Sequence, residues 1–127
     1  LAGHVTVQDY VILAGMVAVH QFCNIGRHAF IAGGSLVRKD IPPFVKAARE
    51  PLSYVGINSV GLRRRGFDSK TIKDIQNIYR ILFQKKYNNT QAINIIEAEV
   101  EATKDRDEIL MFIKNSQRGI MKGYIQN

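Results

Sequence analysis

An aliphatic residue recurs at every sixth position at the start of the chain, and this period constrains the fold more than any other feature. The series is Leu1, Val7, Leu13, Val19, Ile25, Ile31 and Val37. An α-helix repeats its apolar face about every 3.6 residues and a half-buried strand every second residue, so this period requires a longer unit with internal turns. Hexapeptide repetition is typical of a parallel β-helix.

A second inward-facing position lies four residues after each aliphatic. It holds mostly small or β-branched residues: Val5, Val11, Val17, Cys23, Ala29, Ser35 and Ile41. Each hexapeptide would be a short strand and a turn, and three of them would form a triangular coil, so residues 18 apart should stack. At a strand spacing of about 4.8 Å the repeat is only about 11 Å tall, which is little for independent stability.

The composition fits one globular domain. The chain has 127 residues, 46% hydrophobic and 23% charged. No apolar run approaches the roughly 18 to 20 residues that span a bilayer, and no secretion signal opens the chain, so we expect a soluble, cytoplasmic protein. The repeat is already in phase at Leu1 without a polar cap, which predicts that the chain is the C-terminal part of a longer one. The only cysteine, Cys23, is expected in the core of a protein from a reducing compartment.

The repeat ends at Pro42 and Pro43, which cannot donate ladder hydrogen bonds. We therefore predict β-helix coils over residues 1–43, a connecting segment over 44–56 and a helical domain over 57–127. A short helix is expected around Val60 to Arg65. A longer one has Asp68 or Ser69 as its N-cap, a third follows the break at Asn88-Asn89-Thr90, and a fourth begins at Asp105 with Glu108 in a capping-box-like position. Their apolar faces are Ile72, Ile75, Ile78, Tyr79, Leu82 and Phe83, then Ala92, Ile93, Ile96 and Val100, then Ile109, Leu110, Phe112 and Ile113.

Positive charge is concentrated between the two predicted domains. The formal net charge is +7. Residues 38–73 contain nine basic residues, namely Arg38, Lys39, Lys46, Arg49, Arg63, Arg64, Arg65, Lys70 and Lys73, against three acidic ones. This balance favours an acidic partner or substrate, among which nucleic acid, phosphates and acidic proteins all qualify.

Three motifs and one shorter element, all in a fixed order, resemble a known family. They are Leu1-Ala2-Gly3-His4-Val5, Ala18-Val19-His20-Gln21-Phe22-Cys23, Asp40-Ile41-Pro42-Pro43 and Gly61-Leu62-Arg63-Arg64-Arg65-Gly66-Phe67. Together they resemble the C-terminal half of the bacterial UDP-N-acetylglucosamine O-acyltransferases, which transfer a 3-hydroxyacyl group from acyl carrier protein to the sugar in the first step of lipid A synthesis. The resemblance implies a left-handed parallel β-helix followed by a C-terminal α-helical bundle. It also implies a homotrimer with active sites between subunits, and neither a cofactor nor a metal.

The resemblance also implies roles at the first motif. The family's general base is a histidine about one coil before Gly3, which would lie upstream of Leu1. Gly3 would donate its N–H to the oxyanion formed from the thioester, a contact typically worth about 10²–10³ in rate. His4 would bind the sugar nucleotide. The alternatives are a glycine required at a coil corner and a histidine on the surface.

Other family positions map onto the later motifs. His20 and Gln21 would line the ligand cleft, with a polar subunit interface as the alternative, and the 18-residue stacking places Gln21 beside Gly3. Asn58, Arg64 and Arg65 would bind the nucleotide, since guanidinium groups offer paired donors to a diphosphate. A solvated helix face is the alternative there. The family carries an acidic residue where this chain has Val60.

Two further positions follow from the same comparison. Gly33 falls where the family sets acyl-chain length, and its lack of a side chain predicts a long 3-hydroxyacyl chain; a turn glycine is the alternative. His28 follows Gly26-Arg27 and, on the repeat alone, is expected at a corner or outer face; an exposed role facing the carrier protein is the less favoured of its two interpretations. Cys23 faces inward and has no reason to act as a nucleophile.

Three alternative functions have less support in the sequence. Another hexapeptide acyltransferase, such as the N-acyltransferase of the same pathway, would share the coils but not the arginine motif. A zinc β-helix enzyme needs three histidines meeting at one metal, and the spacing of His4, His20 and His28 does not resemble that arrangement. A nucleic-acid-binding module would suit the sequence pI of about 9.8, but no aromatic residues interleave with the basic run. We therefore expect no nucleic acid partner and no membrane insertion.

Overall fold

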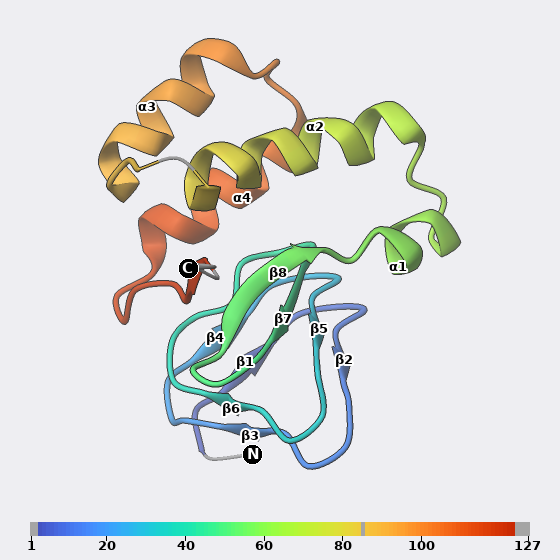
Figure 1. The fold of residues 1–127 in the computed structure, drawn as a ribbon, viewed down its shortest axis with the longest axis vertical. Helices are drawn as coiled ribbons and strands as arrows, with labels where there is room; N and C mark the ends of the chain where they lie inside the picture. The colour runs from blue at the N-terminus through green and yellow to red at the C-terminus, as the bar shows by residue number, and fades with distance from the viewer. Residues whose placement is uncertain (1–2, 85, 124–127) are drawn as a thin grey trace.

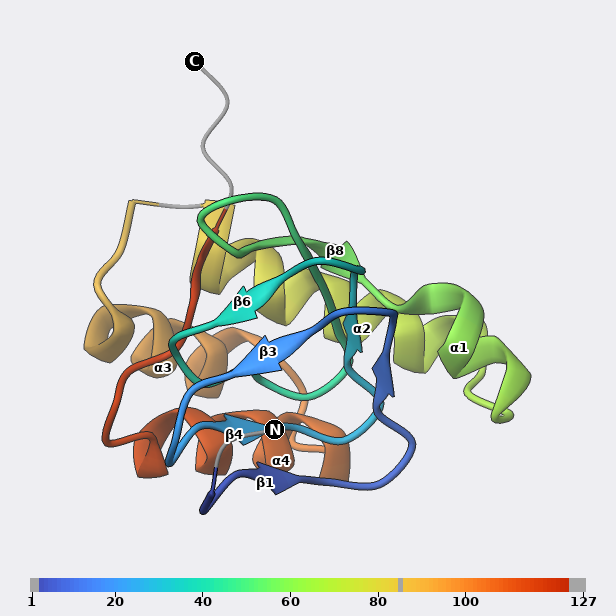
Figure 2. The same cartoon turned by 90° about the horizontal axis from the view of Figure 1, so that it is seen from below.

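The computed structural model describes residues 3–84 and 86–123, and it begins with three pairs of short parallel strands (Figures 1 and 2). The pairs are β1 (Thr6–Val7) with β4 (Asn24–Ile25), β2 (Ile12–Leu13) with β5 (Phe30–Ile31), and β3 (Ala18–Val19) with β6 (Leu36–Val37). Thr6 lies opposite Asn24, and every pair keeps this offset of 18 residues. The predicted stacking is therefore confirmed, except at Leu1, which lies outside the described residues.

The two inward positions of each hexapeptide form the core of the coils. Ile25, Ile31 and Val37 are fully buried, and so is Cys23 at the second inward position. Val7 in the first coil is 39% exposed, because it packs against a following coil only. Burial of the aliphatic series therefore holds the stacked coils together.

A left-handed backbone conformation recurs at the corners of the coils with the same six-residue period. The φ angles are 58° at His4, 62° at Tyr10, 61° at Met16, 69° at Phe22, 63° at His28 and 75° at Gly34. A turn of this type requires a positive φ at its third residue, a conformation that residues other than glycine adopt rarely. The corners are thus strained positions that mostly carry large side chains.

Two strands lie in the segment 44–56, where the sequence predicts only a connection. β7 (Val45–Ala48) runs parallel to β5, and β8 (Ser53–Ile57) runs antiparallel to β7. β9 (Lys122–Gly123), near the C-terminus, extends the same sheet by pairing with β8. Burial alternates along β7 as in an ordinary strand, with Val45 and Ala47 buried and Lys46 exposed. The sequence does not predict this strand, because an alternation over only four residues next to two prolines is too short to recognise.

Four α-helices follow the coils within the described residues up to Gly123. They are α1 (Ser59–Arg64), α2 (Ser69–Tyr79), which continues into the π-helical turn η1 (Arg80–Gln84), α3 (Asn89–Glu99) and α4 (Lys104–Asn115). The predicted cap Asp68 is confirmed at α2. The predicted start of the last helix at Asp105 is wrong, because Thr103 caps it by accepting a hydrogen bond from the N–H of Arg106 at 3.1 Å.

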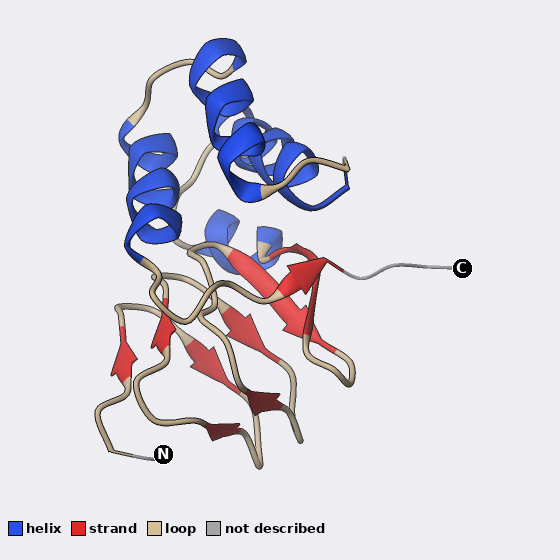
Figure 3. Ribbon diagram, turned by 90° about the vertical axis from the view of Figure 1, so that its left-hand side faces the viewer, coloured by secondary structure: helices blue, strands red, loops and turns tan. Residues whose placement is uncertain are grey.

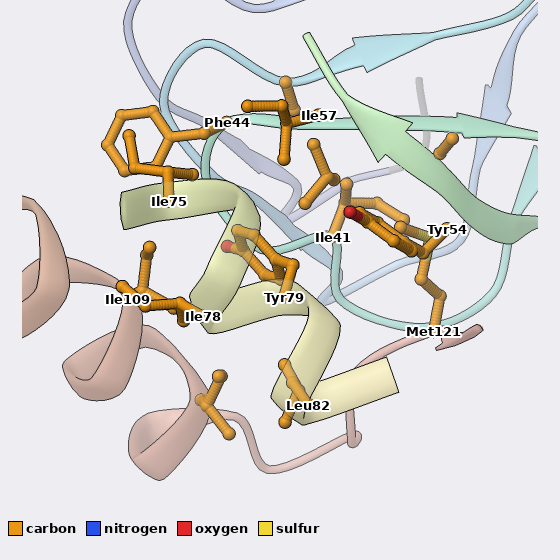
Figure 4. Close-up of a cluster of buried hydrophobic side chains, with 14 of the residues drawn as sticks. Ile41, Phe44, Tyr54, Ile57, Ile75, Ile78, Tyr79, Leu82, Ile109 and Met121 are labelled. Carbon is orange, nitrogen blue, oxygen red and sulfur yellow. The ribbon is translucent and has the colours of Figure 1, made fainter. Parts of the chain in front are cut away.

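The helices lie on one side of the stacked coils and share a core with them (Figures 3 and 4). Tyr79 of α2 is fully buried at their junction, and its hydroxyl donates a hydrogen bond to the carbonyl of Pro43. Its ring stacks on Tyr54 of β8 at 5.6 Å, and burial raises the pKa of Tyr54 to about 12. Ile41 and Ile57 pack into the same cluster from the coil side (Figure 4). The two parts therefore have one continuous apolar core.

Asp40 fastens the chain after α4 to the coils. The carboxylate is almost fully buried; one oxygen accepts from the N–H of Asn24 at 2.8 Å and the other from the hydroxyl of Ser116 at 2.6 Å. The Asp40 carbonyl also accepts from the N–H of Met121 at 3.0 Å. Asp40 is therefore a structural link between segments far apart in sequence.

Replacing Asp40 should destabilise the fold more than replacing an exposed carboxylate. Asp40→Ala is expected to lower the free energy of unfolding by about 3 kcal/mol, since it leaves two polar groups without their charged partner. Asp40→Asn retains an acceptor and should cost less. Urea denaturation measures both, with Asp107→Ala as the control because its side chain is 64% exposed. A loss for Asp40→Ala no larger than that of the control would contradict the assigned role.

Candidate functional site

The residues of the first two motifs gather at one corner of the coils. His4 stacks its ring on Phe22, one coil further on, with centroids 5.3 Å apart, and the N–H of Phe22 donates to the His4 carbonyl at 3.1 Å. The β1–β4 register places Gln21 next to Gly3, as the period predicts. Gly3, His4, His20 and Gln21 are all exposed. The corner therefore presents two imidazoles, one amide and one glycine to the outside.

Gly3 has no packing reason to be glycine within the described residues. A Cβ atom added there would meet nothing within 4 Å, and its φ is not in the positive region. This weighs against the alternative of a glycine required by the corner itself. Close approach of a ligand or of another chain remains as the reason for glycine at this position.

A second group lines a pocket of about 350 Å³ between the coils and α1. The lining residues are Tyr10, Val11, Ile12, His28, Asn58, Gly61, Arg64 and Arg65. The predicted nucleotide-binding residues Asn58, Arg64 and Arg65 are thus brought together. No lining residue is acidic, and Val60 is 60% exposed outside the lining. The pocket is therefore basic and suits an anionic ligand.

Asn58 lies in the pocket wall, where its amide holds the local fold. It is the N-cap of α1, since its Oδ1 accepts from the N–H of Gly61 at 3.3 Å. Its Nδ2 donates to the carbonyl of His28 at 3.0 Å, which ties the helix start to the coil. A Cβ atom on Gly61 would collide with the Asn58 side chain, which explains that glycine. The Asn58 amide therefore uses one of its two N–H donors and one of its two acceptor positions within the fold.

The two arginines reach the pocket from the C-terminal end of α1. Both are exposed, and the guanidinium carbon of Arg65 lies 4.3 Å from the centroid of the Tyr10 ring. A cation over an aromatic face is attracted by the ring quadrupole, so Tyr10 orients Arg65. The neighbouring Arg63 is also exposed but lines no part of this pocket. Of the three consecutive arginines, therefore, Arg64 and Arg65 line the pocket and Arg63 does not.

His28 is buried, so the expectation of an exposed histidine facing a partner is wrong. Its side chain is only 3% exposed. The ring lies between those of Tyr10, at 4.9 Å, and Phe44, at 5.9 Å, while the edge of Phe67 approaches at 5.1 Å. Phe44 and Phe67 come from segments beyond the repeat, which is why the repeat alone does not predict this burial.

The opposite end of this aromatic column is anchored to α4. The guanidinium of Arg27 lies 5.6 Å from the centroid of Phe44 and donates to both oxygens of Glu108, at 2.9 and 3.2 Å. Two parallel hydrogen bonds of this kind fix an arginine in position. In order, the column contains Arg65, Tyr10, His28, Phe44 and Arg27. We call this set the corner column.

Gly33 and Cys23 have structural explanations. A Cβ atom on Gly33 would lie 3.0 Å from the carbonyl oxygen of Gly15 in the preceding coil, so close stacking favours glycine there. The role of Gly33 in acyl-chain length stays a prediction. The thiol of Cys23 is buried, and burial raises its pKa. A thiol of this kind is a core residue and a poor nucleophile.

The two groups occupy different corners of one chain. The turn containing Gly3 and His4 and the turn containing Tyr10 are separated by β1, about six residues along the coil. A fully extended chain would put them at most roughly 20 Å apart. His4 and Gln21 are not among the residues that line the pocket with Arg64 and Arg65.

The sequence matches known proteins along nearly its whole length. Residues 40–121 match the profile of a family described as UDP N-acetylglucosamine O-acyltransferase, domain 2. The acyl-(acyl-carrier-protein)–UDP-N-acetylglucosamine O-acyltransferase of Myxococcus xanthus is 43% identical over 93% of this chain and 46% of its own length. The protein of the same name from Aliivibrio salmonicida is 41% identical over 96% of this chain and 47% of its own length. The chain therefore spans about half the length of the curated relatives it matches.

Solved structures agree with the sequence comparison. The UDP-N-acetylglucosamine acyltransferase of Bacteroides fragilis superposes with a TM-score of 0.95 at 45% identity, over 96% of this chain and 48% of that one. The Arabidopsis UDP-N-acetylglucosamine acyltransferase superposes with a TM-score of 0.89 at 36% identity, over 96% of this chain and 46% of that one. The coils, the added strands and the helices therefore recur together in these proteins.

Neither a membrane-crossing helix nor a metal-binding cluster occurs in the part of the chain that the structure describes. No helix there is long and apolar enough to span a bilayer. No group of three or more histidine, cysteine, aspartate or glutamate side chains within residues 3–84 and 86–123 is arranged to hold a metal ion.

The surroundings of His28 predict a pH dependence of stability. Burial, followed by repulsion from Arg27, lowers the pKa of His28 below its usual value of 6.5. The unfolded state therefore binds this proton more tightly, and stability should fall as the pH drops through about 6.5 towards the folded-state pKa. Above that range the group should contribute no pH dependence.

Urea denaturation between about pH 5.5 and 7.5 measures this effect. His28→Phe removes the titrating group and keeps a ring in the corner column, so the variant should lack this part of the pH dependence. Identical pH profiles for the wild type and the variant would show that His28 does not titrate as expected.

Proposed function

Because the chain belongs to the UDP-N-acetylglucosamine O-acyltransferase family, we propose that the protein containing it transfers a long-chain 3-hydroxyacyl group from acyl carrier protein to the 3-hydroxyl of UDP-N-acetylglucosamine. This is the first step of lipid A synthesis. The observation that carries the proposal is the basic pocket, because the arginines of the motif Gly61 to Phe67 line it in a chain that closely matches this family. A diphosphate needs such donors, and guanidinium groups stay charged at every working pH.

In the proposed mechanism the acyl group moves directly to the sugar, without a covalent intermediate. A histidine upstream of Gly3 removes the proton from the sugar hydroxyl, which attacks the thioester carbonyl. The backbone N–H of Gly3 stabilises the oxyanion, and the open space around this residue supports close approach by the substrate. His4, His20 and Gln21 hydrogen-bond the sugar nucleotide at the same corner. Collapse of the tetrahedral intermediate releases the carrier thiol.

The proposed enzyme is a homotrimer of left-handed β-helices, each followed by a helical bundle, with active sites between subunits. One support is that the two groups of site residues lie at different corners of a chain, so that a neighbouring subunit is needed to bring them together. Another is Phe22, an apolar side chain that is 56% exposed although the preceding coil stacks His4 on its ring.

Acyl carrier protein is acidic, and the proposed docking surface is the basic region over residues 38–73. All nine of its lysine and arginine side chains are exposed. Long-range attraction of this kind speeds association and weakens as salt rises. The proposal places the reaction in the cytoplasm, in keeping with a single cysteine that is buried and forms no disulfide.

An acyl-transfer assay on the full-length protein tests the proposed function. UDP-N-acetylglucosamine and 3-hydroxyacyl carrier proteins of several chain lengths are supplied, and the acylated sugar nucleotide is measured. We expect transfer to the 3-hydroxyl, with long chains preferred, in line with the predicted role of Gly33 in acyl-chain length. A short-chain optimum would contradict the role of Gly33, and no transfer with any donor would refute the function.

Arg64 and Arg65 should matter more than Arg63 for the nucleotide. Arg64→Met and Arg65→Met are each expected to raise KM for UDP-N-acetylglucosamine roughly 10- to 100-fold, the usual value of one or two charged hydrogen bonds. Arg63→Met is the matched control, because Arg63 is exposed on the same helix but lies outside the pocket. Steady-state kinetics at saturating carrier protein measures all three. Equal effects at the three positions would mean that general charge, rather than the pocket, binds the nucleotide.

A further inference from the structure

The buried imidazole of His28 has unused hydrogen-bonding groups at the wall of the basic pocket. No described residue forms a hydrogen bond with either ring nitrogen, although the backbone N–H and carbonyl of His28 are both bonded, to Asp9 and Asn58 respectively. No fully buried side-chain nitrogen or oxygen among the described residues lacks a partner. The ring nitrogens therefore belong to the small part of His28 that remains accessible, and His28 lines the pocket.

The corner column holds this ring in one orientation. Tyr10 and Phe44 stack on its two faces with interplanar angles of 21° and 22°, and Phe67 meets it edge-on at 79°. With both faces covered, only the ring edge can meet a ligand. A fixed imidazole loses little conformational freedom on binding, which is the condition for a specific hydrogen bond.

Packing within the corner column does not by itself explain why residue 28 is a histidine. Phe22 and Phe44 adopt the same left-handed conformation at their corners, with φ angles of 69° and 71° against 63° at His28. Phenylalanine is therefore compatible with this backbone, and it would stack between Tyr10 and Phe44 without burying a polar ring. Because its ring nitrogens stay accessible from the pocket, the histidine offers the pocket a hydrogen-bonding edge that phenylalanine would lack, which points to a partner from outside the chain.

We propose that His28 is a ligand-binding residue of the pocket, whose ring N–H donates a hydrogen bond to a phosphate oxygen of the nucleotide sugar held by Arg64 and Arg65. This inference rests on the proposed function, because it takes the nucleoside diphosphate as the ligand. The Arg65 guanidinium lies 4.3 Å and the His28 ring 4.9 Å from the centroid of Tyr10, so both groups are placed by the same ring. The column thereby sets the spacing of two donors for one anion.

The charge around His28 is consistent with a neutral donor. Burial and the positive charges of Arg27 and Arg65 lower its pKa, while Glu108 and Asp9 act in the opposite direction. A neutral imidazole still carries one N–H, so it donates one hydrogen bond without adding a third full charge beside the arginines. The two arginines carry the positive charge that attracts the phosphate, and the fixed N–H of His28 determines the direction of one hydrogen bond to it.

Two variants of the full-length protein separate the ring nitrogen from the ring itself. His28→Phe keeps the stack and removes the donor, whereas His28→Gln keeps a donor and removes the stack. Calorimetric titration with UDP, and with uridine as a probe that lacks the phosphates, gives the dissociation constants. Thermal unfolding of each variant is recorded in parallel.

The expected result is a Kd for UDP about 10-fold weaker in His28→Phe, close to the loss of one hydrogen bond to a charged group, with less than a twofold change for uridine. His28→Phe should melt no lower than the wild type. His28→Gln should melt lower but retain more UDP affinity than His28→Phe.

The proposal is overturned if the wild type binds UDP and His28→Phe binds it equally well, or if His28→Phe weakens UDP and uridine alike. In both cases the proposed function is unaffected. If the wild type itself binds no UDP, the proposed function and this inference fail together.

Discussion

The hydrogen bonds between successive coils are the constraint on which the other features depend. The N–H groups of Thr6, Ile12 and Ala18 donate to carbonyls of the following coil at 3.1, 2.9 and 3.0 Å, one on each of the three faces. They keep an offset of 18 residues between stacked strands. Because this offset is constant, corner residues of one coil lie above corner residues of the next. The columns at the corners are a consequence of backbone pairing rather than of side-chain attraction alone.

The corners of the coils contain both the strained backbone conformations and the candidate site residues. A positive φ at a residue other than glycine costs roughly 1 kcal/mol, and five successive corners carry such residues from His4 to His28. Stacking across coils, as between Tyr10 and His28, offsets part of that cost. The corners therefore combine a fixed backbone with side chains, such as those of His4 and Tyr10, that can contact another molecule.

Two periods account for what the sequence predicts of the fold. The six-residue period places the strand pairs through Val37, and the helical period from Asp68 places α2. The burial of His28 is not predicted by either period, because it needs Phe44 and Phe67, which are distant in the chain. The cap of α4 is missed for a different reason. Thr103 accepts from the N–H of Arg106 three residues on, and the competing spacing of Asp105 and Glu108 favours a later start.

The candidate site was likewise predictable from the sequence only in part. The arginine motif predicts that Arg64 and Arg65 act together, and the structure places both in one pocket. The sequence reasoning did not select Tyr10 or assign His28 to this pocket. A signal for both was present, since aromatic rings recur 18 residues apart at His4 and Phe22 and again at Tyr10 and His28. That spacing, applied to the corners as well as to the core, predicts the stack of Tyr10 on His28 but not the other members of the corner column.

The corner column also explains why the helices matter to a pocket formed largely at a coil corner. Arg65 and Arg27 are both positively charged and lie at opposite ends of the column, and each is held by a different helix. Arg65 extends from the end of α1, while Glu108 of α4 neutralises and fixes Arg27. The aromatic rings between these two arginines can stay stacked only if both arginines keep their positions. A shift of α4 relative to the coils would therefore alter the position of Arg27, then Phe44 and His28, and finally the donors that face the pocket.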